Sequence, residues 1–346
     1  MALIKETHYT YKDVTIVPAV ITNVEHRKEC NPFYEDDMLP LFTAPMDTVV
    51  NESNFALFET NKIHAILPRV EQYPLETRVA YATRGKWAAF SLDEFIHYFC
   101  TPVIPMFKGY PMRALIDVAN GHMKRLFDAA IEAKLIWGDN LIIMAGNMAN
   151  PEAYLEYSKA GIDYVRCGIG SGFGCLSTSN TGVHMPMASL IDKIKTIKKD
   201  VEHWHEQSGN IYKSVPKIIA DGGIRNYDDA IKTLALGADY AMIGSVFAKM
   251  LESAAPKEEK DGELYATFYG MASKEGQIAM NGEKTKTSEG VKKIIKVEYT
   301  MQGWTENFTD YLRSAMSYTN NETLDRFVNE TNLIVNSENA VNVVNK

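Results

Sequence analysis

A chain of 346 residues is long enough for two average domains or for one large α/β barrel, so length leaves the domain count open. The hydrophobic fraction of 46% and the aromatic fraction of 10% are ordinary for a globular protein with a large core, which argues against extensive disorder. The net charge of −8 includes no basic block, which argues against a nucleic acid or an anionic membrane as the main partner.

The N-terminal segment is polar and charged, and no apolar run is long enough to span a bilayer. We therefore expect a soluble, cytoplasmic protein. The four cysteines, Cys30, Cys100, Cys167 and Cys175, lack the spacing of a zinc site. In a reducing compartment we expect them to be free thiols.

Eight short apolar runs alternate with helix-like segments along the chain. A parallel α/β fold has this alternation, and closure into a barrel accounts most simply for the number eight. We predict a single (β/α)8 TIM barrel domain over residues 1–346, with a doubly wound sheet as the alternative. The predicted strands are residues 39–46, 64–67, 87–92, 114–119, 140–146, 163–169, 217–223 and 240–245, and helices are predicted at 151–161, 187–207 and 226–237.

Six predicted strands end in polar or glycine-rich segments. Turn chemistry alone also places Asp, Asn and Gly after strands. In a barrel, however, these carboxyl ends lie on one face, where catalytic and ligand-binding groups collect, so six of them favour a site. The segments are APMDT, DVANG, AGN, GIGSG, DGG and GS.

The C-terminal part has a different composition. Residues 274–290 are polar and poorly periodic, which predicts a loop rather than a core element, within a flap of about residues 272–290 over the barrel mouth. Residues 305–330 predict helix in two pieces, within a helical tail of about residues 304–346. The Asn-rich last residues are expected to fray.

The segment GIGSGFGCLSTSNTG, residues 168–182, places five glycines around Cys175. Glycines after a strand let backbone N–H groups approach an anion or a flat ligand, because no Cβ blocks them. A cysteine in such a loop lies close to whatever the loop binds. The alternative is a structural turn with a small buried thiol.

The segments after the seventh and eighth strands predict a phosphate site. Gly222, Gly223, Gly244 and Ser245 can donate N–H groups to a phosphate. An ionised Asp221 cannot donate, and is better suited to accept hydrogen bonds from ribose hydroxyls. This division predicts a nucleotide monophosphate or a flavin mononucleotide as the ligand.

The chain resembles the IMP dehydrogenase/GMP reductase family in eight segments that occur in the same order and cover most of its length: YKDVTIVP, APMDTVV, DVANGH, IMAGN, GIGSGFGCLSTSNTGV, IADGGIRNYDDAIKTLALGADYAMIGS, FYGM and SEG. The resemblance implies a (β/α)8 barrel, usually a homotetramer, that binds a purine nucleotide and a nicotinamide cofactor. Cys175 matches the catalytic cysteine of the family.

The flap favours the reductase branch of this family. Dehydrogenases of the family carry an Arg-Tyr pair there that activates water, whereas residues 272–290 contain neither residue. The chain also has no room for the regulatory CBS modules common in dehydrogenases. The resemblance therefore implies NADPH-dependent reductive deamination of GMP to IMP and ammonia, with attack of Cys175 on C2 of the purine. The alternatives are a dehydrogenase without CBS modules that oxidises IMP to XMP, a flavin-dependent barrel, and a nucleotide-binding paralogue without turnover.

The resemblance also implies roles for individual residues. Glu289 of SEG matches a glutamate that assists protonation of the leaving amine through a threonine, whose position Ser177 occupies. Backbone carbonyls of Gly168, Gly170 and Cys175 are expected to hold a monovalent cation such as K⁺. Substrate contacts are expected from Asp221, Gly222, Gly223, Gly244, Ser245, Gly270, Met271, Ala272, Ser288 and Gly290. The cofactor, NADPH with NADH or NAD as alternatives, is expected at Arg27, Asp117, Val118, Ala119, Ile169 and Gly170.

Several positions depart from the family pattern. Phe173 replaces a phosphate-contacting serine, and Thr178 replaces an arginine. AILPR, residues 65–69, replaces the reductase segment IHKHY and lacks its cofactor-side lysine. APMDT, DGGI and MIGS look more like the dehydrogenase. We therefore expect a divergent member of the family.

Overall fold

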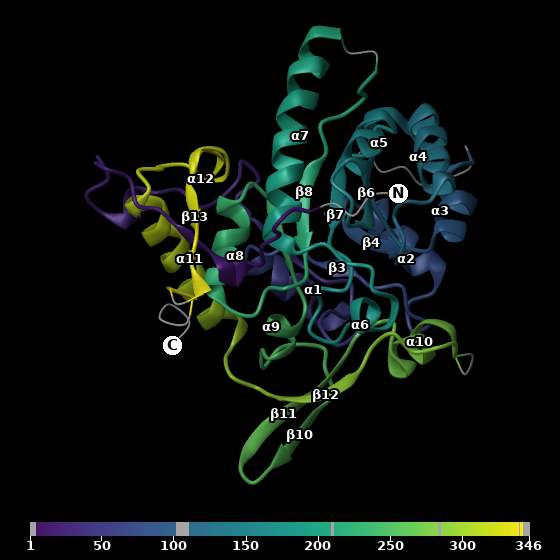
Figure 1. Ribbon diagram of the computed structural model, residues 1–346. Helices are drawn as coiled ribbons and strands as arrows, with labels where there is room; N and C mark the ends of the chain where they lie inside the picture. Colours follow the sequence, from purple (N-terminus) through teal and green to yellow (C-terminus); the bar gives the residue numbers. More distant parts are fainter. Residues whose placement is uncertain (1–4, 102–110, 209–210, 283–284, 339, 342–346) are drawn as a thin grey trace.

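The computed structural model describes residues 5–101, 111–208, 211–282, 285–338 and 340–341. Eight parallel strands lie at its centre, surrounded by helices (Figure 1). All eight coincide with predicted strands. They are β2 (Leu41–Thr43), β3 (Ile66–Leu67), β4 (Trp87–Phe90), β5 (Met112–Asp117), β6 (Leu141–Met148), β7 (Tyr164–Cys167), β8 (Lys217–Asp221) and β9 (Tyr240–Ile243).

The sheet is closed. Its strands follow the order β2-β9-β8-β7-β6-β5-β4-β3. Next to β3, an isolated parallel bridge joins Phe42 of β2 to His64, with Thr43 N donating to His64 O at 2.9 Å and His64 N donating to Leu41 O at 3.0 Å. These bonds join the two ends of the sheet, so the fold is the predicted (β/α)8 barrel and the doubly wound alternative is wrong.

The outer helices begin where side chains cap them. Asn51, Ser91 and Asn226 each accept a hydrogen bond from the backbone N–H three residues later, which fixes the first turns of α1, α3 and α8. The three predicted helices are confirmed as α5, α7 and α8, and α7 projects far beyond the barrel (Figure 1). The helices up to β9 and the one after it are α1 (Glu52–Thr60), α2 (Leu75–Ala82), α3 (Leu92–Phe99), α4 (Lys124–Trp137), α5 (Ala153–Lys159), α6 (Ser177–Thr181), α7 (Met187–Ser208), α8 (Tyr227–Ala235) and α9 (Ser245–Ala248).

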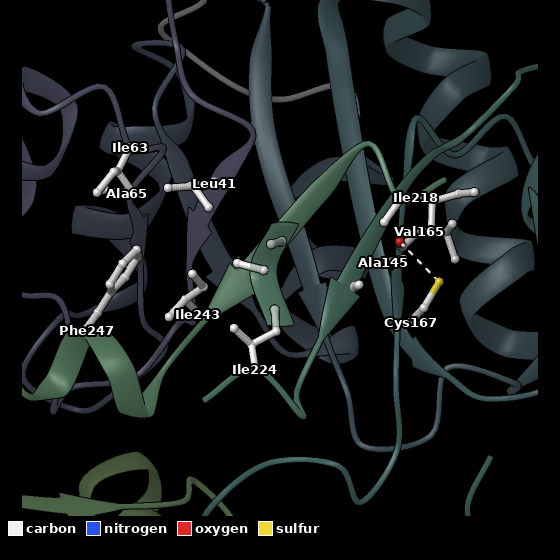
Figure 2. Close-up of a cluster of buried hydrophobic side chains, with 14 of the residues drawn as sticks. Leu41, Ile63, Ala65, Ala145, Val165, Cys167, Ile218, Ile224, Ile243 and Phe247 are labelled. Carbon is white, nitrogen blue, oxygen red and sulfur yellow. Dashed lines mark hydrogen bonds between the residues drawn. The ribbon is translucent and has the colours of Figure 1, made fainter. Parts of the chain in front are cut away.

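Successive residues of each barrel strand alternate between two cores, because the side-chain period of a strand is two. Val165 and Cys167 of β7 face the outer core between strands and helices, where they pack with Ala145 of β6 and Ile218 of β8 (Figure 2). The Cys167 thiol donates to the Val165 carbonyl at 3.6 Å. The barrel interior is filled by Phe42, Ala44, Ile66, Trp87, Ala89, Leu115, Met144, Ile219, Tyr240 and Met242.

His64 makes the stability of this interior dependent on pH. Its ring stacks on Phe42 with 4.6 Å between centroids, and Nε2 has no hydrogen-bond partner within the described residues. Burial lowers the pKa of His64 to about 4, although Asp36 opposes this effect. The folded protein therefore keeps His64 neutral at pH values where the unfolded chain protonates it.

We expect this histidine to cost up to about 3 kcal/mol of folding free energy as pH falls from 6.5 to about 4, and nothing above 6.5. The measurement is urea unfolding of the wild type and of His64→Asn across that pH range. The free-energy difference between the two proteins should shift in favour of the variant as pH falls. Parallel pH profiles would contradict the prediction.

A three-stranded antiparallel sheet, unpredicted from sequence, follows the barrel. It contains β10 (Lys257–Lys260), β11 (Glu263–Tyr269) and β12 (Lys292–Lys296), in that order. It lies with α10 (Lys274–Asn281) at the end of the barrel to which the strands point (Figure 1). The loop prediction for residues 274–290 is wrong for α10, which Ser273 caps by accepting from Gly276 N. Two turns of helix are too short to show a clear period.

The two-piece C-terminal helix is confirmed as α11 (Met301–Tyr318) and α12 (Leu324–Glu330). The chain then forms β13 (Leu333–Val335), which pairs antiparallel with β1 (Val14–Ile16), and neither strand was predicted. The final Asn-rich residues from 342 lie outside the described residues. No helix within the described ranges is long and apolar enough to cross a membrane.

Candidate active site

A layer of charged side chains closes the barrel interior at the carboxyl ends of its strands. The period-two alternation places Asp117 of β5, Arg166 of β7 and Asp221 of β8 on the interior side. Arg166 donates from Nη1 to Asp117 Oδ1 at 2.6 Å and from Nε to Asp221 Oδ2 at 2.9 Å. Arg69, after β3, donates from Nε to the other Asp117 oxygen at 3.0 Å. The four residues form one ion-pair chain.

Pairing keeps this buried layer charged. Burial alone raises the pKa of Asp117, but Arg69 and Arg166 outweigh it and hold that pKa below its ordinary value. Burial likewise lowers the pKa of Arg166, but Asp221 and Asp117 outweigh it and the pKa is raised. At Gly146 of β6 a Cβ would lie 2.3 Å from Arg166 O, so only glycine fits beside this arginine.

Cys175, Ser177 and Glu289 lie in hydrogen-bond contact, as the resemblance implied. The Cys175 thiol lies 3.4 Å from Ser177 Oγ, and Ser177 Oγ donates to Glu289 Oε2 at 2.6 Å. The backbone supports this contact, because Leu176 N donates to Glu289 O at 2.7 Å and Cys175 forms an antiparallel bridge with Gly290. A hydroxyl is thus held between a thiol and a carboxylate.

Cys175 is the accessible thiol of the chain. Cys30, Cys100 and Cys167 are buried, whereas Cys175 is half-buried, and all four are free. Burial raises the pKa of Cys100 to about 11 and raises that of Cys167 further. A buried, protonated thiol is a poor nucleophile, so Cys100 and Cys167 are structural.

Two cavities meet at Cys175. The first, of about 170 Å³, lies between the loops after β2, β7, β8 and β9 and residues 268–271. The second, of about 590 Å³, lies between β5, the glycine-rich loop and the flap. Seven residues line both: Asp117, Arg166, Gly172, Cys175, Asp221, Gly222 and Met271. This arrangement lets two ligands meet at one thiol.

Most of the predicted binding residues line one or both of the two cavities. The first is lined by the predicted substrate residues Asp221, Gly222, Gly223, Gly244, Ser245, Gly270 and Met271, and also by Phe173. The second is lined by the predicted cofactor residues Asp117, Val118, Ala119, Ile169 and Gly170, by Ala272, and by the cations Arg69 and Lys286.

The comparisons with known proteins agree with this geometry. A family model described as the IMP dehydrogenase / GMP reductase domain matches residues 113–343, which is most of the chain. The chain belongs to the IMP dehydrogenase/GMP reductase family. Its relatives include the GMP reductase of Shouchella clausii, 30% identical over 342 residues with 95% of this chain and 96% of the relative covered. The GMP reductase of Bacillus licheniformis is 30% identical over 344 residues, with 95% and 97% covered. This chain is therefore a divergent, GMP reductase-like member of the family.

Some predicted site residues of this family member lie outside both cavities. Arg27, in a short 3₁₀ helix (Arg27–Glu29), pairs with Asp310 of α11 at 2.8 Å and lines neither cavity. Ser288 lines neither cavity, and its Oγ donates to Gly290 O at 2.9 Å. Within the described part of this one chain, Arg27 is thus not brought to the site.

Residues 168–178, here called the cation loop because the family resemblance implies a monovalent cation at its carbonyls, contain unpaired hydroxyls. Ser171 Oγ and Thr178 Oγ1 are buried and have no partner within the described residues. At Gly170, where φ is +75°, a Cβ would lie 1.8 Å from Thr178 Oγ1, so the loop requires glycine there. The Gly168 carbonyl accepts a hydrogen bond from Asn147 Nδ2 at 2.8 Å. In the described ranges no three His, Cys, Asp or Glu side chains form a metal-binding group.

Several residues of the site were not predicted from the sequence. Arg166, Arg69 and Asn147 were not predicted, although Asn147 Nδ2 donates to Asp221 Oδ2 at 2.8 Å. An arginine inside the apolar strand YVRC is a usable signal, because a buried arginine needs carboxylate partners. Tyr269 donates to Asp47, whose pKa burial raises, and no sequence signal indicated that pair.

Proposed function

We propose that this protein is a GMP reductase, an NADPH-dependent oxidoreductase that deaminates GMP to IMP and ammonia. The observation that carries the proposal is the contact of Ser177 with Cys175 and Glu289: all three line the second cavity, and Cys175 also lines the first. The first cavity offers backbone N–H groups for a phosphate, and the second, on the other side of Cys175, has room for another ligand. The relatives described above are GMP reductases, which supports the same direction of reaction.

The chemistry of the site supports a covalent route. Cys175 Sγ forms a bond to C2 of GMP, and the bond from C2 to the exocyclic nitrogen breaks. Ser177 donates a proton to the departing amine and recovers one through Glu289. NADPH, held by residues that line the second cavity, would supply the hydride that C2 receives. The C–S bond then breaks, so that GMP, NADPH and two protons yield IMP, NADP⁺ and ammonium.

The first cavity offers the groups that a nucleotide monophosphate needs. Backbone N–H groups of Gly222, Gly223, Gly244 and Ser245 border it and can donate to the phosphate. Arg166 and Asn147 both donate to Asp221 Oδ2. The other Asp221 oxygen has no protein donor among the described residues, which leaves it for a ribose hydroxyl.

The second cavity fits the chemistry of NADPH. Its lining carries no net charge, because three cations (Arg69, Arg166 and Lys286) are matched by three carboxylates (Asp117, Asp221 and Glu289). Lys286 forms no ion pair among the described residues, so its ammonium group can contact a phosphate of the dinucleotide. The negative charge of Asp117 is compensated, because both of its carboxylate oxygens are paired with arginine. NADH and NAD remain alternatives for this cavity.

Absorbance at 340 nm tests the proposal, with GMP plus NADPH in one assay and IMP plus NAD in the other. We expect absorbance to fall with GMP and stay constant with IMP. A rise with IMP would instead identify a dehydrogenase without CBS modules. No change in either assay would favour the nucleotide-binding paralogue, and a bound yellow chromophore would favour the flavin-dependent barrel.

Glu289→Gln is expected to lower kcat for GMP by about 10²-fold, because a neutral amide cannot return a proton to Ser177. The KM for GMP should change less than about threefold, since Glu289 does not line the first cavity. Steady-state kinetics measure both, with Glu275→Gln of α10 as the control. An unchanged kcat would remove Glu289 from the relay.

The other expectations stay predictions of the family resemblance. They are contact of Arg27 with a cofactor phosphate, closure of Ser288 and Gly290 over the purine, and K⁺ at the carbonyls of Gly168, Gly170 and Cys175. They also include a homotetramer, a cytoplasmic location, and the lack of a nucleic-acid or membrane partner. The buried unpaired hydroxyls of Ser171 and Thr178 support a polar occupant beside the cation loop.

A further inference from the structure

Phe173, which stands where the family has a phosphate-contacting serine, is held by two strands of the C-terminal sheet. The Lys293 Nζ atom lies 3.6 Å from the centroid of the Phe173 ring and donates to the Phe173 carbonyl at 2.9 Å. The Phe268 ring lies 6.1 Å from the Phe173 ring. Lys293 of β12 and Phe268 of β11 are cross-strand partners. One lysine therefore binds both the ring and the backbone of this loop residue.

These contacts flank both of the segments that form the relay of Cys175, Ser177 and Glu289. Phe173 comes two residues before Cys175, and Lys293 comes four residues after Glu289. Between them the two segments are joined by a short antiparallel contact, in which Leu176 N donates to Glu289 O and Val291 N donates to Gly174 O. An isolated bridge of this length is weakly fixed in register, and a slip of one residue would turn the Glu289 side chain to the other face.

We infer that Lys293 and Phe173 form a clamp that sets the register of residues 289–291 against residues 174–176 and thereby places Glu289 on Ser177. The inference rests on the roles proposed above for Ser177 and Glu289. Lys293 is a positioning residue, because it contacts the loop and lies outside the lining of both cavities. The aromatic ring at position 173 gives up a hydroxyl donor and provides a face for a cation.

The clamp makes a prediction about backbone dynamics that does not depend on turnover. Hydrogen–deuterium exchange of the full-length, unliganded protein should be about 10-fold faster in Lys293→Met for peptides covering 173–177 and 289–293. Lys293→Arg should restore slow exchange, because arginine keeps the charge and a donor. Lys292→Met is the matched control: it removes the same charge from the neighbouring exposed position of β12 and should leave exchange unchanged.

Unchanged exchange in Lys293→Met would overturn the clamp. Faster exchange that extends equally to the barrel strands β5 and β6 would also overturn it, because it would report global destabilisation rather than loss of local register. Both outcomes are read on a protein without ligand. The clamp can therefore fail while the proposed function stands, and the reverse is also true.

Kinetics separate positioning of the relay from a merely structural effect. Lys293→Met should lower kcat for GMP about 10-fold in the wild-type background and have no further effect in Glu289→Gln, because both changes disable the same relay. If the two reductions in kcat multiply in the double variant Lys293→Met/Glu289→Gln, the positioning role of Lys293 is overturned. A wild-type protein without turnover would contradict the proposed function instead, and the exchange measurement would still decide the clamp.

Discussion

Cys175→Ala is expected to abolish turnover of GMP, with a fall in kcat of at least about 10⁴-fold. The proposed route requires a bond between sulfur and C2 of the purine, and no other thiol is accessible, since Cys30, Cys100 and Cys167 are buried. Absorbance at 340 nm with GMP and NADPH measures the rate. Mass spectrometry of the wild type, quenched during turnover, should show a nucleotide adduct on the peptide containing Cys175.

Binding distinguishes loss of the nucleophile from loss of the site. Cys175→Ala removes one sulfur from the boundary of the two cavities, so we expect the Kd of GMP, measured by calorimetry, to change less than about threefold. Cys100→Ala is the control, because it removes a buried thiol outside both cavities. Full activity of Cys175→Ala would eliminate covalent catalysis at this residue.

Arg166→Met is expected to cost about 3–5 kcal/mol of unfolding free energy. The variant leaves Asp221 buried without an ion-pair partner and leaves Asp117 with Arg69 alone, and an uncompensated buried charge is costly. Urea unfolding followed by tryptophan fluorescence measures the loss. Adding Asp221→Asn to the variant should recover part of it, since the uncompensated charge of Asp221 is then removed.

Arg69→Met provides the comparison. Arg69 is more exposed than Arg166 and contacts Asp117 alone among the described carboxylates, so we expect a loss of about 1 kcal/mol. Equal losses for the two arginines would show that the interior layer is not held by Arg166.

The barrel could be predicted from sequence because each of its strands is recognisable from a few consecutive residues. Each strand is a short apolar run followed by glycine, Asp or Asn, as in KIIADGG at residues 217–223, and such runs are recognisable without knowing their partners. The position of Cys175 among glycines was similarly readable. The contact of Cys175 with Ser177 and Glu289 came from the family resemblance, because residues 175 and 289 are far apart in the chain.

The remaining features depend on pairing between distant segments. The strand β12, with sequence KKIIK, carries three lysines and a single buried residue, Ile295, so its pattern does not indicate a strand until β11 lies beside it. A charged residue at position 166, inside an apolar strand, is explained only when Asp117 and Asp221 are found beside it in the barrel interior. Phe173 reads as a lost phosphate ligand until Lys293 is found on its ring.

The pairing of β1 with β13 has a consequence for synthesis of the chain. Thr15 and Asn336, whose side chains share a hydrogen bond, are 321 positions apart. During synthesis, β1 therefore leaves the ribosome long before β13, the strand with which it pairs. All eight barrel strands can emerge in between. Truncation of the chain before β13 should thus expose residues 14–16 to proteases. The barrel should stay intact, because β13 is not one of its strands.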